Sequence, residues 1–216
     1  MKKYQYLFFD LDGTIIDSSE GVCKSFAYAL KHYGINVDDL AVLRPVIGPP
    51  LKDSFMNLYD FDEDKAIEAV AKYRERYTDV GILECRLYEG VRELLKELAH
   101  RGYKLVLATS KPKIFARRIM ERYELDGYFH FIAGAQIGGT ISNKEDVLGY
   151  ILQSLNITDV SDCLMIGDTK YDLAGAEYFG IDALGVLYGF GTRDELNAYP
   201  NVGLAGSAGD IASILP

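Results

Sequence analysis

The chain of 216 residues has few of the residues that build metal centres from sulfur and imidazole. Its three cysteines, Cys23, Cys85 and Cys163, lie far apart and follow no metal-binding spacing. No cluster of cysteine and histidine supports a zinc site. Because the number of cysteines is odd and their positions are scattered, we expect reduced thiols, buried or half-buried, rather than a disulfide framework.

Long apolar runs and an excess of positive charge are also absent. No stretch approaches the roughly 20 apolar residues of a membrane span. The first expected strand follows residues 1–5 directly, which leaves no room for a signal peptide. The formal charge of −9 disfavours nucleic acid and anionic membranes as partners, because both bind basic surfaces. We therefore expect a cytoplasmic protein that binds neither, as a monomer or a weak homodimer.

The rest of the sequence shows two kinds of pattern. Short apolar segments occur at residues 6–9 and again after residue 83, where they alternate with amphipathic helices. The expected strands in this second region cover 103–108, 130–134, 163–167 and 183–187. The helices between them are long enough for right-handed crossovers, so we expect an α/β fold with a Rossmann-like parallel sheet core.

The segment between the first two strands carries only helical patterns. Helices are expected at 22–33, 37–43, 51–58 and 62–77. The second should stop before Pro45, and the last should turn Ile67 inward. These patterns predict two domains, in which residues 1–16 and 83–216 form the α/β core and residues 17–82 an inserted helical-bundle cap domain.

The first candidate site lies at the end of the first strand. Asp10 and Asp12 follow the apolar run 6–9 directly, and ligands of open α/β sheets bind at the carboxyl ends of strands. Two carboxylates so close together repel each other unless a cation or a shared proton relieves them. The alternative is an ordinary turn, since aspartate and glycine are common turn residues.

Two further expected strands also end in polar groups. These groups are Thr109, Ser110 and Lys111 after the strand at 103–108, and Asp168, Thr169 and Asp172 after the strand at 163–167. Because the carboxyl ends of parallel strands share one edge, we expect these groups to converge with Asp10. Oxygen ligands of this kind suit Mg²⁺. Asp168 has an alternative role as a helix N-cap, and Asp172 as a favourable acid in the first turn of a helix.

Four motifs of the chain resemble, in order, those of the haloacid dehalogenase-like hydrolases. They are Phe8-Phe9-Asp10-Leu11-Asp12-Gly13-Thr14, Thr109 at a strand end, Lys144, and Gly167-Asp168-Thr169-x-x-Asp172. The helical insert resembles the cap of the subclass that contains phosphoglycolate phosphatases. The chain departs from the family pattern in having no proline after Lys144, and Lys111 is the alternative source of positive charge.

The resemblance implies a mechanism. Asp10 would attack phosphorus and form an aspartyl-phosphate, while Asp12 would protonate the leaving oxygen and later deprotonate the attacking water. Thr109 would donate to a phosphoryl oxygen, and Lys144 would supply positive charge. The Mg²⁺ ligands would be Asp10, Asp12 through a backbone carbonyl, and Asp168, with Asp172 in the outer shell. Further phosphate contacts would come from Leu11, Gly13, Thr14 and Ser110.

The insert would set the choice of substrate. Lys52 and Arg44 would reach a carboxylate or a second phosphate of the substrate, and solvated surface charges are the alternative reading of both. The predicted function is a Mg²⁺-dependent phosphatase for small-molecule phosphomonoesters, similar to phosphoglycolate phosphatase. A 5′-nucleotidase, a β-phosphoglucomutase-like phosphomutase and, outside the enzymes, a receiver-like phosphoaspartate signalling module are the alternatives.

Overall fold

The computed structural model describes residues 4–215. They form two compact units: a sheet unit, made of the chain up to Ile16 and from Leu87 onward, and a helical unit, Asp17–Arg86. The second boundary lies at 86/87, whereas the sequence predicts 82/83. Residues just past 83 belong to the helical unit because Glu84 is paired with Arg76, with 2.7 Å between Oε2 and Nη1.

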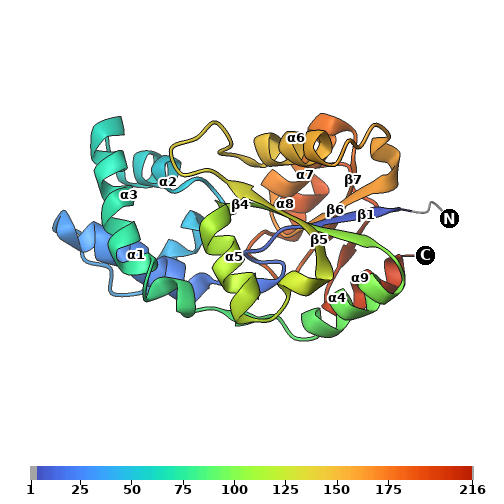
Figure 1. Cartoon of the computed structure of the whole chain (residues 1–216). Helices are drawn as coiled ribbons and strands as arrows, with labels where there is room; N and C mark the ends of the chain where they lie inside the picture. Colours follow the sequence, from blue (N-terminus) through green and yellow to red (C-terminus); the bar gives the residue numbers. More distant parts are fainter. Residues whose placement is uncertain (1–3, 216) are drawn as a thin grey trace. The chain divides into compact units, whose positions relative to one another are not determined.

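The sheet unit contains six parallel strands in the order β5-β4-β1-β6-β7-β8. They are β1 Tyr6–Phe9, β4 Lys104–Pro112, β5 Phe129–Ala135, β6 Cys163–Gly167, β7 Asp182–Val186 and β8 Gly203–Ala205. The helices are α4 Val91–His100, α5 Lys113–Arg122, α6 Lys144–Ser154, α7 Lys170–Phe179, α8 Arg193–Asn197 and α9 Ala208–Ile214, with 3₁₀ turns at Asp126–Tyr128 and Val160–Asp162. Helices α6 and α7 cover one face of the sheet, and α4, α5 and α9 the other (Figure 1). The predicted α/β fold is confirmed.

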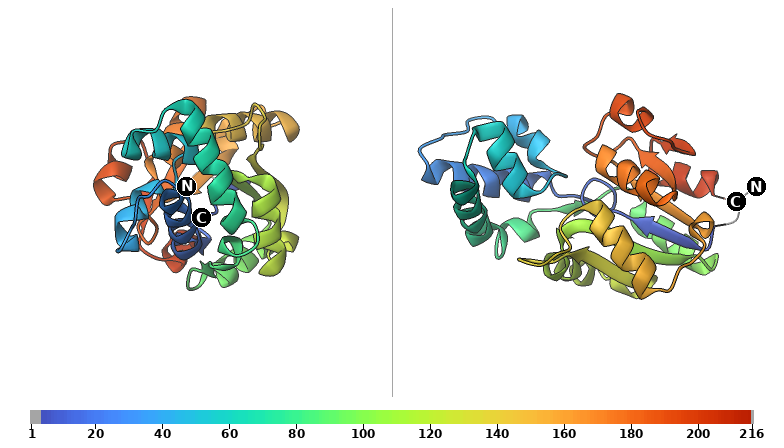
Figure 2. Two further views of the ribbon diagram at one scale, coloured as in Figure 1. Left: turned by 90° about the vertical axis from the view of Figure 1, so that its left-hand side faces the viewer. Right: turned by 90° about the horizontal axis from the view of Figure 1, so that it is seen from above.

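Strand β1 lies inside the sheet, between β4 and β6, and is the dark blue arrow in the right-hand view of Figure 2. Its residues Leu7, Phe8 and Phe9 are buried, although successive side chains of a strand point to opposite faces. Phe8 packs into a core with side chains from the neighbouring strands and from α6 and α7, including Val106 and Met165. Burial on both faces explains why the run before Asp10 is apolar without interruption.

Three short strands are not predicted by the sequence. Strand β8 has only three residues, and β2 (Ile16–Asp17) and β3 (Arg86–Leu87) have two each. The last two pair with each other where the chain leaves and re-enters the sheet unit. Segments this short have too few alternating positions to produce a strand pattern.

The helical unit consists of α1 Ser19–His32, α2 Leu51–Tyr59 and α3 Glu63–Tyr77, with 3₁₀ helices at Leu40–Val46 and Gly81–Leu83. Its core is aromatic: Phe26 stacks on Phe55 with 4.0 Å between the ring centroids. Two predictions are wrong here. Pro45 lies inside the first 3₁₀ helix rather than after its end, and Ile67 is 54% exposed because Ala66 and Ala69 form the buried face of α3.

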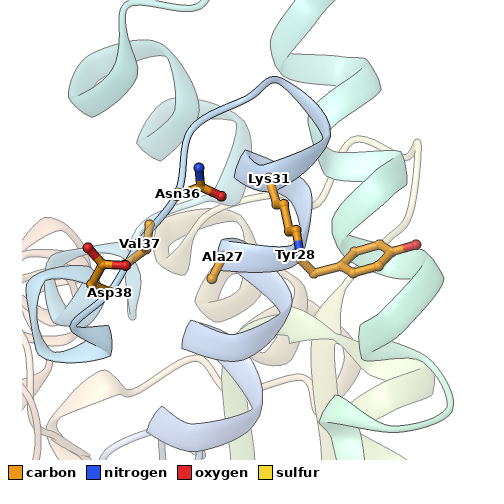
Figure 3. A pocket seen from close by; sticks show the side chains of 6 residues that line it. All are labelled: Ala27, Tyr28, Lys31, Asn36, Val37 and Asp38. Atoms are coloured by element: carbon orange, nitrogen blue, oxygen red, sulfur yellow. The ribbon is translucent and has the colours of Figure 1, made fainter.

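The helical unit also has a surface pocket, open to solvent, of about 490 Å³ (Figure 3). Its lining comes from α1 and the segment after it: Ala27, Tyr28, Lys31, Asn36, Val37 and Asp38. None of the residues predicted for the site lines this pocket. Throughout residues 4–215, no helix combines the length and the apolar character needed to cross a membrane.

Gly21 allows the closest backbone approach within the helical unit, and its replacement gives the first testable prediction. Its N–H donates to Glu84 O at 3.0 Å, and a Cβ at this position would lie 1.9 Å from Gly81 O. We expect Gly21→Ala to lower the free energy of unfolding by about 1–3 kcal/mol, because α1 must move away from Gly81.

Urea unfolding followed by circular dichroism measures this loss. Gly127→Ala is the matched control, since a Cβ there meets nothing within 4 Å. A Gly21→Ala protein as stable as the control would show that the contact between α1 and Gly81 is not close-packed.

Candidate active site

The turn after β1 brings Asp10 against the end of β6. The Asp10 N–H donates to Ile166 O at 3.0 Å, and the Gly13 N–H closes the turn on Ile16 O at 2.8 Å. Gly13 has φ +88°, and a Cβ there would lie 2.0 Å from Asp168 Oδ2. Only glycine fits this position, both for its backbone angle and for the room it leaves to Asp168.

Asp10, Asp168 and Asp172 form a buried cluster of carboxyl groups. One oxygen from each lies within 4.8 Å of the others. Asp168 follows β6 and is held by two donors, the Thr14 hydroxyl at 3.1 Å and the Phe190 N–H at 2.8 Å. The predicted convergence of two strand ends is therefore present in the sheet unit.

Lys144 joins two of these carboxyl groups from the first turn of α6. Its Nζ lies 2.9 Å from Asp10 Oδ1 and 2.6 Å from Asp172 Oδ1, and it donates to Ala108 O at 2.7 Å. The ammonium group is buried with them. Lys144 thus neutralises part of the charge of the cluster.

Helix α7 starts with a cap that uses Asp172 rather than Asp168. The N-cap residue is Thr169, whose N–H and hydroxyl donate to Asp172 Oδ2 at 3.0 and 2.9 Å. The N-cap alternative for Asp168 is therefore wrong. Asp172 has two roles, since one oxygen closes the capping box and the other contacts Lys144.

A second ion pair lies at Asp12. Lys111 Nζ is 2.7 and 2.8 Å from the two oxygens of Asp12, and the Lys111 N–H donates to the hydroxyl of buried Thr109 at 3.1 Å. The two lysines that the sequence could not tell apart thus have different partners, Lys144 the cluster around Asp10 and Lys111 the side chain of Asp12. Ser110, between Thr109 and Lys111, is half-buried.

Burial and mutual repulsion shift the pKa values of the cluster. Burial raises the pKa of Asp10 to about 6, against the attraction of Lys144 and with added repulsion from Asp172 and Asp12. Burial also raises the pKa of Asp168 well above its usual range, and Asp172 and Asp10 add to this shift. For Lys144, burial disfavours the charged form, but attraction by Asp10 and Asp172 outweighs it and raises the pKa.

The residues present fit a divalent cation. Asp10, Asp12 and Asp172 share two ammonium groups, Lys111 and Lys144, and Asp168 adds a fourth carboxyl group, so the ionised carboxylates outnumber the ammonium groups by two. Among residues 4–215, the buried oxygens Asp10 Oδ1 and Asp172 Oδ1 have no polar partner besides the Lys144 ammonium group. A set of carboxylate oxygens with excess negative charge is what Mg²⁺ binds in proteins.

The loop after β7 is a part of the site that the sequence analysis misses. Phe190 supplies the N–H to Asp168, and the Tyr188 hydroxyl donates to Thr14 O at 3.0 Å. At Gly189, a Cβ would lie 2.3 Å from Asp168 Cβ. The available signal is the spacing of Gly189 and Gly191 directly after a strand, which indicates close backbone approach.

The other predicted contacts lie as follows. Leu11 and Gly13 are buried in the turn, and the side chain of Thr14 points to Asp168. Within the helical unit, the side chain of Lys52 is 42% exposed and pairs with Glu63 at 3.0 Å, and Arg44 is exposed. The proposed roles of these residues toward a substrate stay predictions.

A family model of the haloacid dehalogenase-like hydrolases matches residues 7–186, which include all four motifs. The chain belongs to this family. A 5′-nucleotidase of Pseudomonas aeruginosa is 45% identical over 91% of the chain and 89% of its own length. The tyrosine-protein kinase PtkA of Mycobacterium tuberculosis is 36% identical over 88% of the chain, which spans 64% of that relative.

Solved structures of the family have the same fold. The crystal structure of a predicted phosphatase from Clostridium acetobutylicum superposes with a TM-score of 0.94 at 43% identity, covering 98% of this chain and 97% of that one. By sequence, a phosphoglycolate phosphatase of Colwellia psychrerythraea is a more distant relative. It is 28% identical over 92% of this chain and 91% of its own length. The predicted family is thus confirmed, and the predicted enzyme class, a phosphoric monoester hydrolase, agrees with the phosphatase names of these relatives.

Proposed function

We propose that the chain is a Mg²⁺-dependent phosphatase that hydrolyses small-molecule phosphomonoesters through an aspartyl-phosphate on Asp10. The observation that carries this proposal is the buried cluster of Asp10, Asp168 and Asp172 around Lys144, with Asp12 beside it. Four acids and two lysines gathered at one sheet edge have an electrostatic cost that a purely structural role would not require.

In the first step, a carboxylate oxygen of Asp10 attacks phosphorus and the bond from phosphorus to the ester oxygen breaks. Asp12 gives a proton to the departing oxygen, so the alcohol leaves neutral. Thr109 and the backbone N–H groups after Asp10 donate to the phosphoryl oxygens. The carboxylates of Asp10 and Asp168 would hold Mg²⁺ together with a backbone carbonyl at Asp12, and the ion would neutralise charge on the phosphoryl group.

In the second step, Asp12 takes a proton from water, and the water oxygen attacks phosphorus. The bond between phosphorus and Asp10 breaks, which releases phosphate and restores both carboxyl groups. Lys144 keeps Asp10 in position throughout, because its ammonium group is itself fixed by Asp172 and Ala108 O. The proton that Asp12 gives to the leaving oxygen in the first step is replaced by the one it takes from water in the second.

Nucleoside monophosphates are the substrate class that we propose first. The relative named 5′-nucleotidase is 45% identical over nearly the whole chain, whereas the one named phosphoglycolate phosphatase is 28% identical. The prediction from sequence places phosphoglycolate first, and the higher identity to the relative named 5′-nucleotidase supports our placing nucleotides before it. The relative named as a tyrosine kinase supports a second outcome, in which a hydroxyl group rather than water accepts the phosphoryl group.

The proposal is tested with a panel of nucleoside monophosphates, phosphoglycolate and p-nitrophenyl phosphate. We expect Mg²⁺-dependent release of phosphate, fastest from a nucleotide, which EDTA abolishes and excess Mg²⁺ restores, because the carboxylates cannot hold phosphate without the cation. If folded protein releases phosphate from none of these esters, the phosphatase proposal is wrong. Stable, stoichiometric phosphorylation by a small phosphodonor would instead favour the receiver-like alternative.

A further inference from the structure

The ladder between β4 and β5 contains a bulge beside the candidate site. Thr109 pairs with Gly134 and Pro112 pairs with Ala135, so Ser110 and Lys111 have no counterpart on β5. Bulges of this kind bend a strand and redirect its side chains, and they are frequent next to active sites. Gly134 makes room for the bulge, since a Cβ there would lie 2.7 Å from Lys111 O.

The bulge directs Lys111 to a residue 99 positions away. Its Nζ contacts both oxygens of Asp12, at 2.7 and 2.8 Å, and the two side chains are 8% and 14% exposed. A charge-assisted contact to both oxygens restricts rotation of the carboxyl group. The Lys111 N–H also donates to the Thr109 hydroxyl at 3.1 Å, so the same residue orients Thr109.

Lys144 has a different set of contacts. Its Nζ lies against Asp10, Asp172 and the carbonyl of Ala108. Each of the two acids after β1 therefore has its own lysine. A group that transfers a proton must be held within hydrogen-bond reach of its target, and a small displacement costs a large part of the rate.

We propose that Lys111 is a positioning residue that holds the carboxyl group of Asp12 in place for proton transfer to the leaving oxygen. This inference rests on the proposed function, in which Asp12 is the acid and base. Lys111 then acts on the chemical step and not on the affinity for substrate. Its effect depends on how much the leaving group needs a proton.

The test compares Lys111→Met with wild type on two substrates. A nucleoside monophosphate needs a proton on its leaving oxygen, whereas dinitrophenyl phosphate releases a stable anion. We expect kcat/KM for the nucleotide to fall about 100-fold, the lower limit for general acid catalysis. For dinitrophenyl phosphate kcat/KM should fall less than about threefold, because kcat/KM reports only the steps up to departure of the leaving group, and KM for the nucleotide should be nearly unchanged.

Two further variants serve as controls. Lys113→Met removes a lysine two positions along, whose Nζ lies over the rings of Phe131 and Tyr150 at 5.6 and 5.8 Å, and should leave both substrates unaffected. Lys111→Arg keeps the charge and at least two donors. Its kcat/KM for the nucleotide should therefore be at least about tenfold higher than that of Lys111→Met. If Lys111→Met is unfolded by circular dichroism, Lys111→Gln, which removes the charge but keeps a polar side chain, takes its place, and an unchanged ratio of the two kcat/KM values relative to wild type overturns the proposal.

Equal losses for the two substrates, a raised KM with unchanged kcat, or no loss at all would each overturn the positioning role. The second of these outcomes would make Lys111 a substrate-binding residue instead. Failure of the proposed function is recognised separately, because wild-type protein would then hydrolyse neither ester.

Discussion

Asp10→Asn is expected to lower kcat for every phosphomonoester by at least about 10⁴-fold, since an amide cannot attack phosphorus in place of the carboxylate. Asparagine has the same size as aspartate and keeps an oxygen near Lys144, so the fold should persist. Steady-state release of phosphate from a nucleotide and from p-nitrophenyl phosphate measures the loss. Circular dichroism and the melting temperature verify that the variant is folded.

Asp60→Asn is the matched control for this change. Asp60 is exposed in the helical unit and has φ +52°, a conformation that asparagine also adopts readily. The mass of Asp10→Asn must be checked, because deamidation would regenerate the carboxylate. Turnover within tenfold of wild type by an intact amide would remove Asp10 from the role of nucleophile.

Lys144→Met is expected to give the largest loss of stability, about 3–5 kcal/mol in EDTA. The variant keeps the length of the side chain but leaves Asp10 and Asp172 without the cation that they share at 2.9 and 2.6 Å. Two buried carboxylates then face each other unpaired. Urea unfolding in EDTA, followed by circular dichroism, measures the difference from wild type.

The double variant Lys144→Met/Asp172→Asn separates charge from packing. It removes one of the unpaired carboxylates, so we expect it to be more stable than Lys144→Met alone by at least about 1 kcal/mol. If the double variant is less stable than the single one, the capping box of Thr169 and Asp172 outweighs the repulsion. In that case the cluster is not held together by the charge of Lys144.

Much of the sheet unit follows from local patterns. Residues 7–9 are buried although their side chains alternate between the two faces of the sheet, and this burial requires the unbroken apolar run that predicts a strand. Asp10 and Asp168 end adjacent parallel strands, so topology alone brings them together. The prediction for Ile67 is wrong because α3 buries the face that carries Ala66 and Ala69. Where a helix has apolar residues on two faces, their spacing does not tell which face packs against the rest of the unit.

The contacts of Asp12 and Asp168 could not be predicted in the same way. The pairing of Lys111 with Asp12 requires two extra residues in β4 and a glycine at 134, and the sequence pattern ends the strand at 108. Asp168 accepts from the backbone N–H of Phe190. Any residue other than proline at this position could supply that N–H, so the sequence does not reveal the contact. Both features depend on the close approach of segments far apart in the chain.

The central claim is that Asp10 carries the phosphoryl group during turnover. Its most direct test is acid quenching of the protein with Mg²⁺ and ³²P-labelled dinitrophenyl phosphate, whose leaving group needs no proton from Asp12. The Asp12→Asn variant, which should hydrolyse the intermediate slowly, is included to make it accumulate. The account predicts a label on the protein that hydroxylamine removes, that maps to the peptide containing Asp10, and that Asp10→Asn lacks. Turnover by wild type with no label in either protein, or a label on another residue, would contradict it.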